Sequence, residues 1–63
     1  MQPYQERVVQ EKTELDIKIG KLNSFIESPK FYTVTQLERR HLIRQMQAMG
    51  TYSDILGERI SAF

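Results

Sequence analysis

Apolar residues recur every three or four positions along the first part of the chain. At 100° per residue, one face of a helix beginning near Tyr4 collects five apolar side chains: Val8, Leu15, Ile19, Leu22 and Ile26. The stripe is about as wide as one seam against a partner helix. Pro3 fits the first helical turn, and Pro29 disfavours the α conformation in the residue before it. The pattern predicts a helix over about residues 3–27.

A second periodic segment follows a loop of about residues 28–34, which carries an apolar patch. Thr35 and Glu38 have the spacing of a capping box, which predicts a helix over about residues 35–61, with a start at Thr33 as the alternative. The apolar stripe of this second helix consists of Leu42, Met46, Met49, Leu56, Ile60 and Phe63. The polar Ser53 lies on the same face.

Two long helices and a short loop predict an all-α fold, a two-helix antiparallel hairpin that forms a single domain over residues 1–63. The chain has no cysteine, so no disulfide supports it. Chains this short rarely bury enough apolar surface alone, and association is then the usual remedy. We therefore expect a homo-oligomer.

Charge and composition exclude several classes of function. Nine basic and eight acidic residues give a net charge of +1, which argues against binding to nucleic-acid polymers. There is no apolar leader and no apolar run near the roughly 18 residues of a membrane span, so we expect a soluble intracellular protein without membrane contact. His41 is the only histidine, which makes a metal site improbable, and no cofactor is expected.

No catalytic arrangement is visible in the sequence. His41 has no cysteine nucleophile to activate, and no glycine-rich phosphate loop is present. Asp54 and Glu58 lie one turn apart on an outer face, without the apolar surroundings that would raise a carboxyl pKa. We interpret the protein as a non-enzyme.

The border of the first apolar stripe carries the strongest candidate ligand site. Tyr4, Arg7 and Lys18 recur there at helical spacing. Tyr4 can stack on a base while Arg7 and Lys18 hold phosphate oxygens. The alternative is structural: Tyr4 covers the end of the seam, and Glu11 and Glu14 neutralise the two cations.

Three further groups have a functional and a structural interpretation each. Gly50 and Gly57 open a shallow groove, which favours helix–helix contact over a ligand. Tyr52 and Arg59 border the second stripe and are candidates for the same pocket or a second one. A basic cluster lies near the positive end of the helix dipole, which leaves room for an acidic partner or an anion: Arg39, Arg40, His41 and Arg44.

The residue patterns of both predicted helices resemble those of a family of small phage proteins. The first helix carries Y-x-x-R-V-x-x-E-x-x-x-L-x-x-K-x-x-K-L from Tyr4 to Leu22, and the second carries Q-x-x-A-M-G-x-Y-x-x-x-L-x-x-R from Gln45 to Arg59. They resemble the helical-hairpin sponges of bacteriophages, which comprise the anti-CBASS cyclic-oligonucleotide sponges and a related Thoeris anti-defence sponge. The resemblance covers most of the chain.

The resemblance implies a compact homohexamer of interlocked hairpins in the cytoplasm of the infected bacterial host. Such a protein would sequester cyclic dinucleotides in pockets between subunits, for immune evasion and without cleavage. Some members of the group hold cyclic trinucleotides at separate sites, and the Thoeris branch prefers cyclic ADP-ribose isomers. Tyr4 matches the base-stacking aromatic; Lys18 fits the phosphate-contacting lysine best, with Lys21 next.

The leading hypothesis is thus a sponge that binds a cyclic dinucleotide through Tyr4, Arg7 and Lys18 or Lys21. The alternative is a small helical protein-interaction module without a nucleotide ligand. It would bind its partner through the apolar seam or through the basic cluster of the second helix. The sequence leaves the ligand's bases and linkage, the subunit number and a trinucleotide site open.

Overall fold

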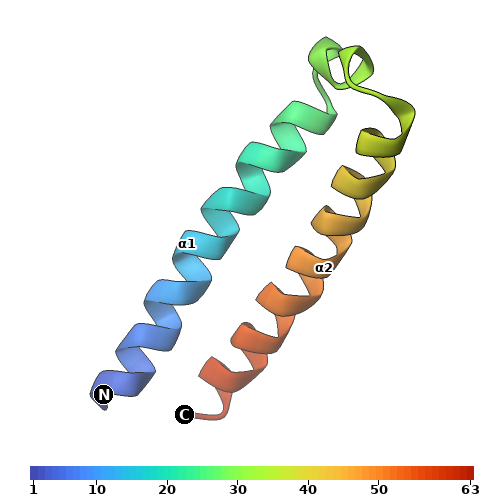
Figure 1. The fold of residues 1–63 in the computed structure, drawn as a ribbon. Helices are drawn as coiled ribbons and strands as arrows, with labels where there is room; N and C mark the ends of the chain where they lie inside the picture. Colours follow the sequence, from blue (N-terminus) through green and yellow to red (C-terminus); the bar gives the residue numbers. More distant parts are fainter.

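The computed structural model describes residues 1–63 as two antiparallel α-helices joined by a short 3-10 helix (Figure 1). Helix α1 spans Pro3–Ile26, the 3-10 helix η1 spans Pro29–Thr33, and helix α2 spans Gln36–Ser61. The hairpin measures 45 × 15 × 13 Å, and the two chain ends lie together at the end opposite η1. The prediction of an all-α two-helix hairpin is confirmed.

Side chains fix the start of each helix. Gln5 Oε1 accepts a hydrogen bond from the backbone N–H of Gln2 at 2.8 Å, so the first turn of α1 has a cap that the sequence analysis did not anticipate. Thr35 Oγ1 accepts from the backbone N–H of Glu38 at 3.1 Å, as the capping pattern predicted. The reciprocal bond from the Glu38 side chain is not formed, so the box is half complete.

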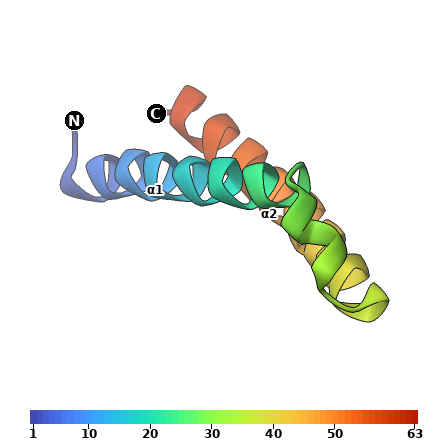
Figure 2. The ribbon, with the colours of Figure 1, turned by 90° about the horizontal axis from the view of Figure 1, so that it is seen from above.

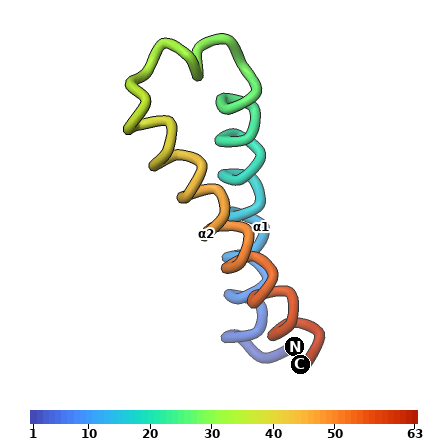
Figure 3. Tube along the Cα trace, turned by 90° about the vertical axis from the view of Figure 1, so that its right-hand side faces the viewer, coloured from blue at the N-terminus to red at the C-terminus, as the bar shows by residue number.

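The two helices cross at an angle and separate toward η1, as Figures 2 and 3 show from two further directions. The core accordingly lies where the helices are close. It consists of Val8, Leu15 and Leu56, with Leu56 wholly inaccessible to solvent. Three half-buried side chains pack against this core, and all three come from the predicted stripes: Ile19, Met49 and Ile60.

Aromatic packing closes the wider end of the hairpin. Phe31 of η1 is buried, and its ring meets Phe25 of α1 edge-on at 6.3 Å between centroids. The exposed Tyr32 also meets Phe31 edge-on, with 5.6 Å between the ring centroids. The apolar patch of the loop thus covers the end of the helical seam.

Few side chains are buried in one hairpin. Only five of the 63 residues are buried, whereas Ile17, Leu37 and Ile55 are each about half exposed or more. A core of this size stabilises a chain weakly, because the apolar area removed from water is small. This burial is consistent with the expected self-association. Neither helix combines the length and the apolar character needed to cross a membrane.

Candidate functional site

Tyr4 meets the end of the chain at the open end of the hairpin. Its ring lies edge-on to Phe63, with 5.8 Å between the centroids and 75° between the planes. Both rings remain substantially exposed, Tyr4 at 51% and Phe63 at 42%. Phe63 belongs to the second apolar stripe, and helical spacing alone does not connect it to Tyr4. The contact supports the structural role proposed for Tyr4 and leaves much of its ring accessible.

Two guanidinium groups accompany this aromatic pair. Arg7 follows Tyr4 by three residues on α1, and Arg59 lies in the last turn of α2, which ends at Ser61. The Tyr4–Phe63 contact joins these two helix ends, so both arginines lie at the same end of the hairpin. Of the two alternatives left open for Arg59, the same pocket or a second one, the structure places Arg59 at the same end of the hairpin as Tyr4 and Arg7.

The remaining predicted ligand residues lie farther along the molecule. Lys18 follows Tyr4 by fourteen residues, which is about 21 Å along the axis of α1, and Lys21 lies one turn beyond. Tyr52 is 42% exposed. Its neighbour Ser53 bonds to Lys12, which places Tyr52 level with the middle of α1. Within one chain, Tyr4 and Lys18 are thus at separate places.

The charges on this side of the hairpin are unpaired within the chain. The single ion pair of the molecule joins Lys12 and Asp16 at 3.2 Å. Glu14 instead accepts a hydrogen bond from Gln10 at 3.1 Å. The predicted neutralisation of Arg7 by Glu11 and of Lys18 by Glu14 is therefore wrong, because exposed pairs gain only tenths of a kcal/mol, about 0.2–0.5, and need not form.

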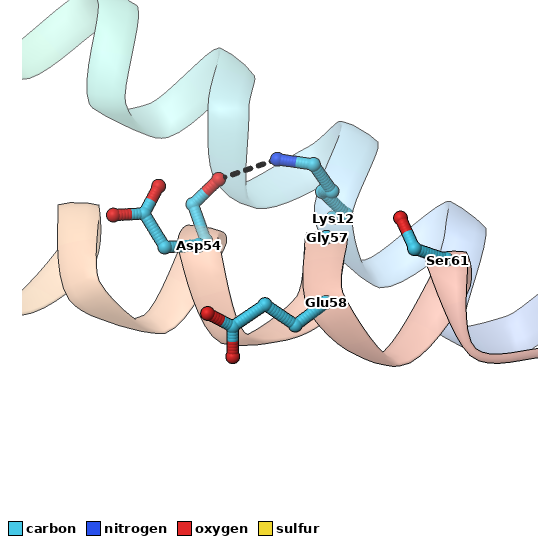
Figure 4. A pocket seen from close by; sticks show the side chains of 6 residues that line it. Lys12, Asp54, Gly57, Glu58 and Ser61 are labelled. Carbon is cyan, nitrogen blue, oxygen red and sulfur yellow. Dashed lines mark hydrogen bonds between the residues drawn. The ribbon is translucent and has the colours of Figure 1, made fainter.

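A polar network occupies the opposite flank of the helix pair. Lys12 Nζ donates to Ser53 Oγ at 2.7 Å, the bond drawn in Figure 4. Ser53 Oγ in turn donates to Asp16 Oδ1 at 2.5 Å. Ser53 is 6% exposed, so its hydroxyl depends on these two partners. A Cβ atom at Gly57 would lie 3.6 Å from Lys12 Cε, which is an ordinary van der Waals distance to a flexible side chain. Gly57 therefore lies beside Lys12 of α1, whereas Gly50 faces open space, and within one hairpin neither glycine admits a backbone approach that a Cβ atom would prevent.

The network also changes the acidity of the Asp16 carboxyl group. The hydrogen bond from Ser53, followed by the hydrogen bond from Lys12, lowers the pKa of the Asp16 carboxyl group below its usual value. The carboxylate therefore stays ionised throughout the physiological range. The ionised group keeps Lys12 in place across the helix pair.

An open depression of about 650 Å³ adjoins this network. Six residues line it: Lys12, Ser53, Asp54, Gly57, Glu58 and Ser61 (Figure 4). Lys12 is already bonded to Ser53 and Asp16, so the free charged groups of the depression are the carboxylates of Asp54 and Glu58. None of the predicted ligand residues lies here, and the chemistry does not suit a phosphate. No cluster of three or more metal-ligating side chains is present.

The basic cluster of α2 divides into two parts. Arg39 donates to the carbonyl oxygen of Val34 at 2.7 Å, and its guanidinium lies 5.8 Å from the centre of the Tyr32 ring. Arg39 therefore fastens the loop to α2. Arg40 and Arg44 are exposed and have no such contacts.

Comparison with known proteins gives two matches. The family model described as Sequestin matches residues 2–62 of this chain. The chain is also 41% identical over 63 residues to the "uncharacterized 7.5 kDa protein in denB-rIIB intergenic region" of Enterobacteria phage T4. That alignment covers 100% of this chain and 98% of the phage protein. No solved structure matches the chain.

Proposed function

This chain belongs to the Sequestin family, and from that membership we propose that it is a phage protein that sequesters a nucleotide signal. The family name denotes sequestration, and the full-length relative comes from a phage. Cyclic dinucleotides are the proposed ligand class, with cyclic trinucleotides and cyclic ADP-ribose isomers as the alternatives. Sequestration lowers the free concentration of the signal, so that a host defence such as CBASS is not triggered.

The Tyr4–Phe63 pair with Arg7 and Arg59 is the observation that carries this proposal. Tyr4 offers a half-exposed aromatic ring, and stacking on a base contributes about 1–3 kcal/mol. The two arginines have no acidic partner within the chain. A guanidinium binds phosphate oxygens in a bidentate manner, so this group supplies both contacts that a nucleotide requires.

The proposed site is shared between subunits. Lys18 lies about 21 Å along the helix axis from Tyr4, so a phosphate close to the Tyr4 ring would more easily meet the Lys18 or Lys21 of a second copy. A cyclic dinucleotide has two similar halves, and a two-fold interface presents the same residues to each half. Tyr52, on the same border of α2 as Arg59, is proposed as a further stacking surface in this site.

Titration calorimetry against a panel of cyclic dinucleotides, cyclic trinucleotides and cyclic ADP-ribose isomers tests the proposal, with the ligand recovered and analysed afterwards. We expect tight binding of one class, less than one ligand per chain, and intact ligand. Heat from no member of the panel would contradict the proposal and favour a protein-interaction module. Recovery of a degraded ligand would indicate that the protein is an enzyme and does not merely sequester the ligand.

Matched variants locate the site. Tyr4→Ala and Arg59→Gln should each weaken binding by at least about tenfold, because each removes about 1.4 kcal/mol or more of stacking or phosphate contact. Tyr32→Ala and Lys30→Gln remove an exposed ring and an exposed cation at the other end of the hairpin, and should leave the affinity unchanged. Equal losses of affinity in the site variants and the control variants would contradict the assignment of the ligand site to Tyr4 and Arg59.

A further inference from the structure

The first turn of α1 is held by few contacts. No hydrogen bond or ion pair of the hairpin joins residues 1–7 to α2. The cap of this turn is local, because the Gln5 side chain bonds the backbone of Gln2. The first buried side chain of α1 is Val8, one turn after Tyr4. Since helix ends fray, the Tyr4 ring lies on a segment that its own helix restrains weakly.

Phe63 supplies a contact from the other helix to this turn. Its ring meets the Tyr4 ring edge-on, with 5.8 Å between the centroids and 75° between the planes. Gln5 Nε2 also donates to the Tyr4 hydroxyl, but at 3.5 Å this hydrogen bond is long and weak. The orientation of the Tyr4 ring therefore depends chiefly on Phe63.

Phe63 is itself fixed, although it lies beyond the end of α2 at Ser61. The Phe63 backbone N–H donates to the Ile60 carbonyl oxygen at 3.2 Å, and the Ala62 N–H donates to the Glu58 carbonyl oxygen at 3.1 Å. Ile60 packs against the hydrophobic core. The last turn of α2 thus carries the Phe63 ring at a position set by the core, and this ring can restrain a neighbour.

We propose that Phe63 is a positioning residue of the ligand site, which holds the Tyr4 ring in the orientation that stacks on a base. This role rests on the proposed function. In an edge-on pair, Phe63 covers at most one face of the Tyr4 ring, and Tyr4 stays 51% exposed. A ring that is held before binding loses less side-chain freedom when the base arrives, which tightens the complex. Phe63 acts through Tyr4 and need not touch the ligand.

Substitutions at Phe63 separate a positioning ring from an apolar cover. Phe63→Leu keeps an apolar side chain without a ring, and should weaken nucleotide binding about three- to tenfold in titration calorimetry. Phe63→Tyr keeps the ring and should bind within about twofold of the wild type. In a Tyr4→Ala background, Phe63→Leu should cause no further loss, because the two residues act as one unit.

The other end of the hairpin offers a matched control. Phe25→Leu removes one ring from the edge-on pair with Phe31. This variant loses a comparable aromatic contact, and should bind the nucleotide as the wild type does. Circular dichroism verifies that the Phe63 and Phe25 variants keep the helicity of the wild type.

NMR of the ligand-free protein tests the restraint itself. In the wild type and in Phe63→Tyr, the Tyr4 side chain should occupy one χ1 rotamer, with nuclear Overhauser contacts to the ring at position 63. In Phe63→Leu the Tyr4 couplings should average over more than one rotamer.

The outcomes distinguish this role from the proposed function. A wild type that binds no nucleotide of the panel contradicts the proposed function, and the role of Phe63 falls with it. A wild type that binds while Phe63→Leu binds equally well would overturn the role of Phe63 alone. Additive losses in the double variant, or a Tyr4 rotamer that does not depend on the ring at position 63, would do the same.

Discussion

Lys12 donates a hydrogen bond to Ser53 across the helix pair, at a level where both apolar stripes are interrupted. Lys12 lies between Val8 and Leu15 in the spacing of the first stripe, and Ser53 lies between Met49 and Leu56 in the second. One polar residue from each helix therefore meets the other at the flank of an otherwise apolar seam, where Ser53 is buried and the Lys12 side chain is 31% exposed. Such a layer favours the register that satisfies both groups, because a shifted register would leave the Ser53 hydroxyl unbonded.

Removing one partner of this layer should destabilise the hairpin. Ser53→Ala leaves Lys12 with only Asp16, and we expect the free energy of unfolding to fall by about 1–3 kcal/mol. Lys12→Met combined with Ser53→Ala replaces both partners by apolar groups and should restore most of that loss. Urea denaturation at one fixed protein concentration measures both variants. A double variant as unstable as the single one would contradict this account.

The lowered pKa of Asp16 predicts a stability that depends on pH. The pKa is lower in the folded chain than in the unfolded one, so the unfolded chain binds the proton more readily. The contribution of Asp16 is therefore complete above the unfolded pKa of about 4, and is lost as the pH falls through the folded value. The difference in unfolding free energy between the wild type and Asp16→Asn should therefore shrink as the pH falls below about 4. A constant difference from pH 7 to pH 2 would exclude this role.

Truncation at the centre of the core should be the most damaging single change. Leu56 is 0% exposed, so Leu56→Ala removes buried methyl groups and leaves a cavity. We expect a loss of about 2–5 kcal/mol, which is a large share of the stability of a 63-residue chain. Leu37→Ala is the matched control, because Leu37 is 61% exposed. Thermal unfolding followed by circular dichroism should separate the two variants clearly, and equal melting temperatures would refute the placement of Leu56.

Gly20 offers a stabilising substitution. An added Cβ atom would meet nothing within 4 Å, so Gly20→Ala gains helix propensity at no steric cost. We expect the free energy of unfolding to rise by about 0.8–1.0 kcal/mol. Gly57→Leu, in contrast, would extend a side chain toward Lys12 Cε, which a Cβ atom at Gly57 already approaches to 3.6 Å, and should lower stability. A destabilised Gly20→Ala variant would indicate that another chain packs against this face.

Local spacing determined the two helices and their antiparallel arrangement. The recurrence of Val8 and Leu15 on one segment and Leu56 on the other predicts two apolar faces, and each face can be buried only against a partner helix. Thr35 and Pro29 mark the ends of the connecting loop through their own backbone chemistry. These signals act over a few residues, which is why the sequence by itself was sufficient for them.

Only the tertiary structure decided which side chains meet across the hairpin. Lys12 and Ser53 are 41 residues apart in sequence, and their contact depends on the register in which the helices pack. The same register brings Tyr4 to Phe63 and thereby gathers Arg7 and Arg59, a grouping that helical spacing cannot reveal. Spacing along α1 allows the pairs Arg7–Glu11, Lys12–Asp16 and Glu14–Lys18, but only Lys12–Asp16 forms, and Ser53 reinforces it from α2. Exposed pairs gain too little energy for spacing alone to select them, whereas a contact from the opposite helix fixes one geometry.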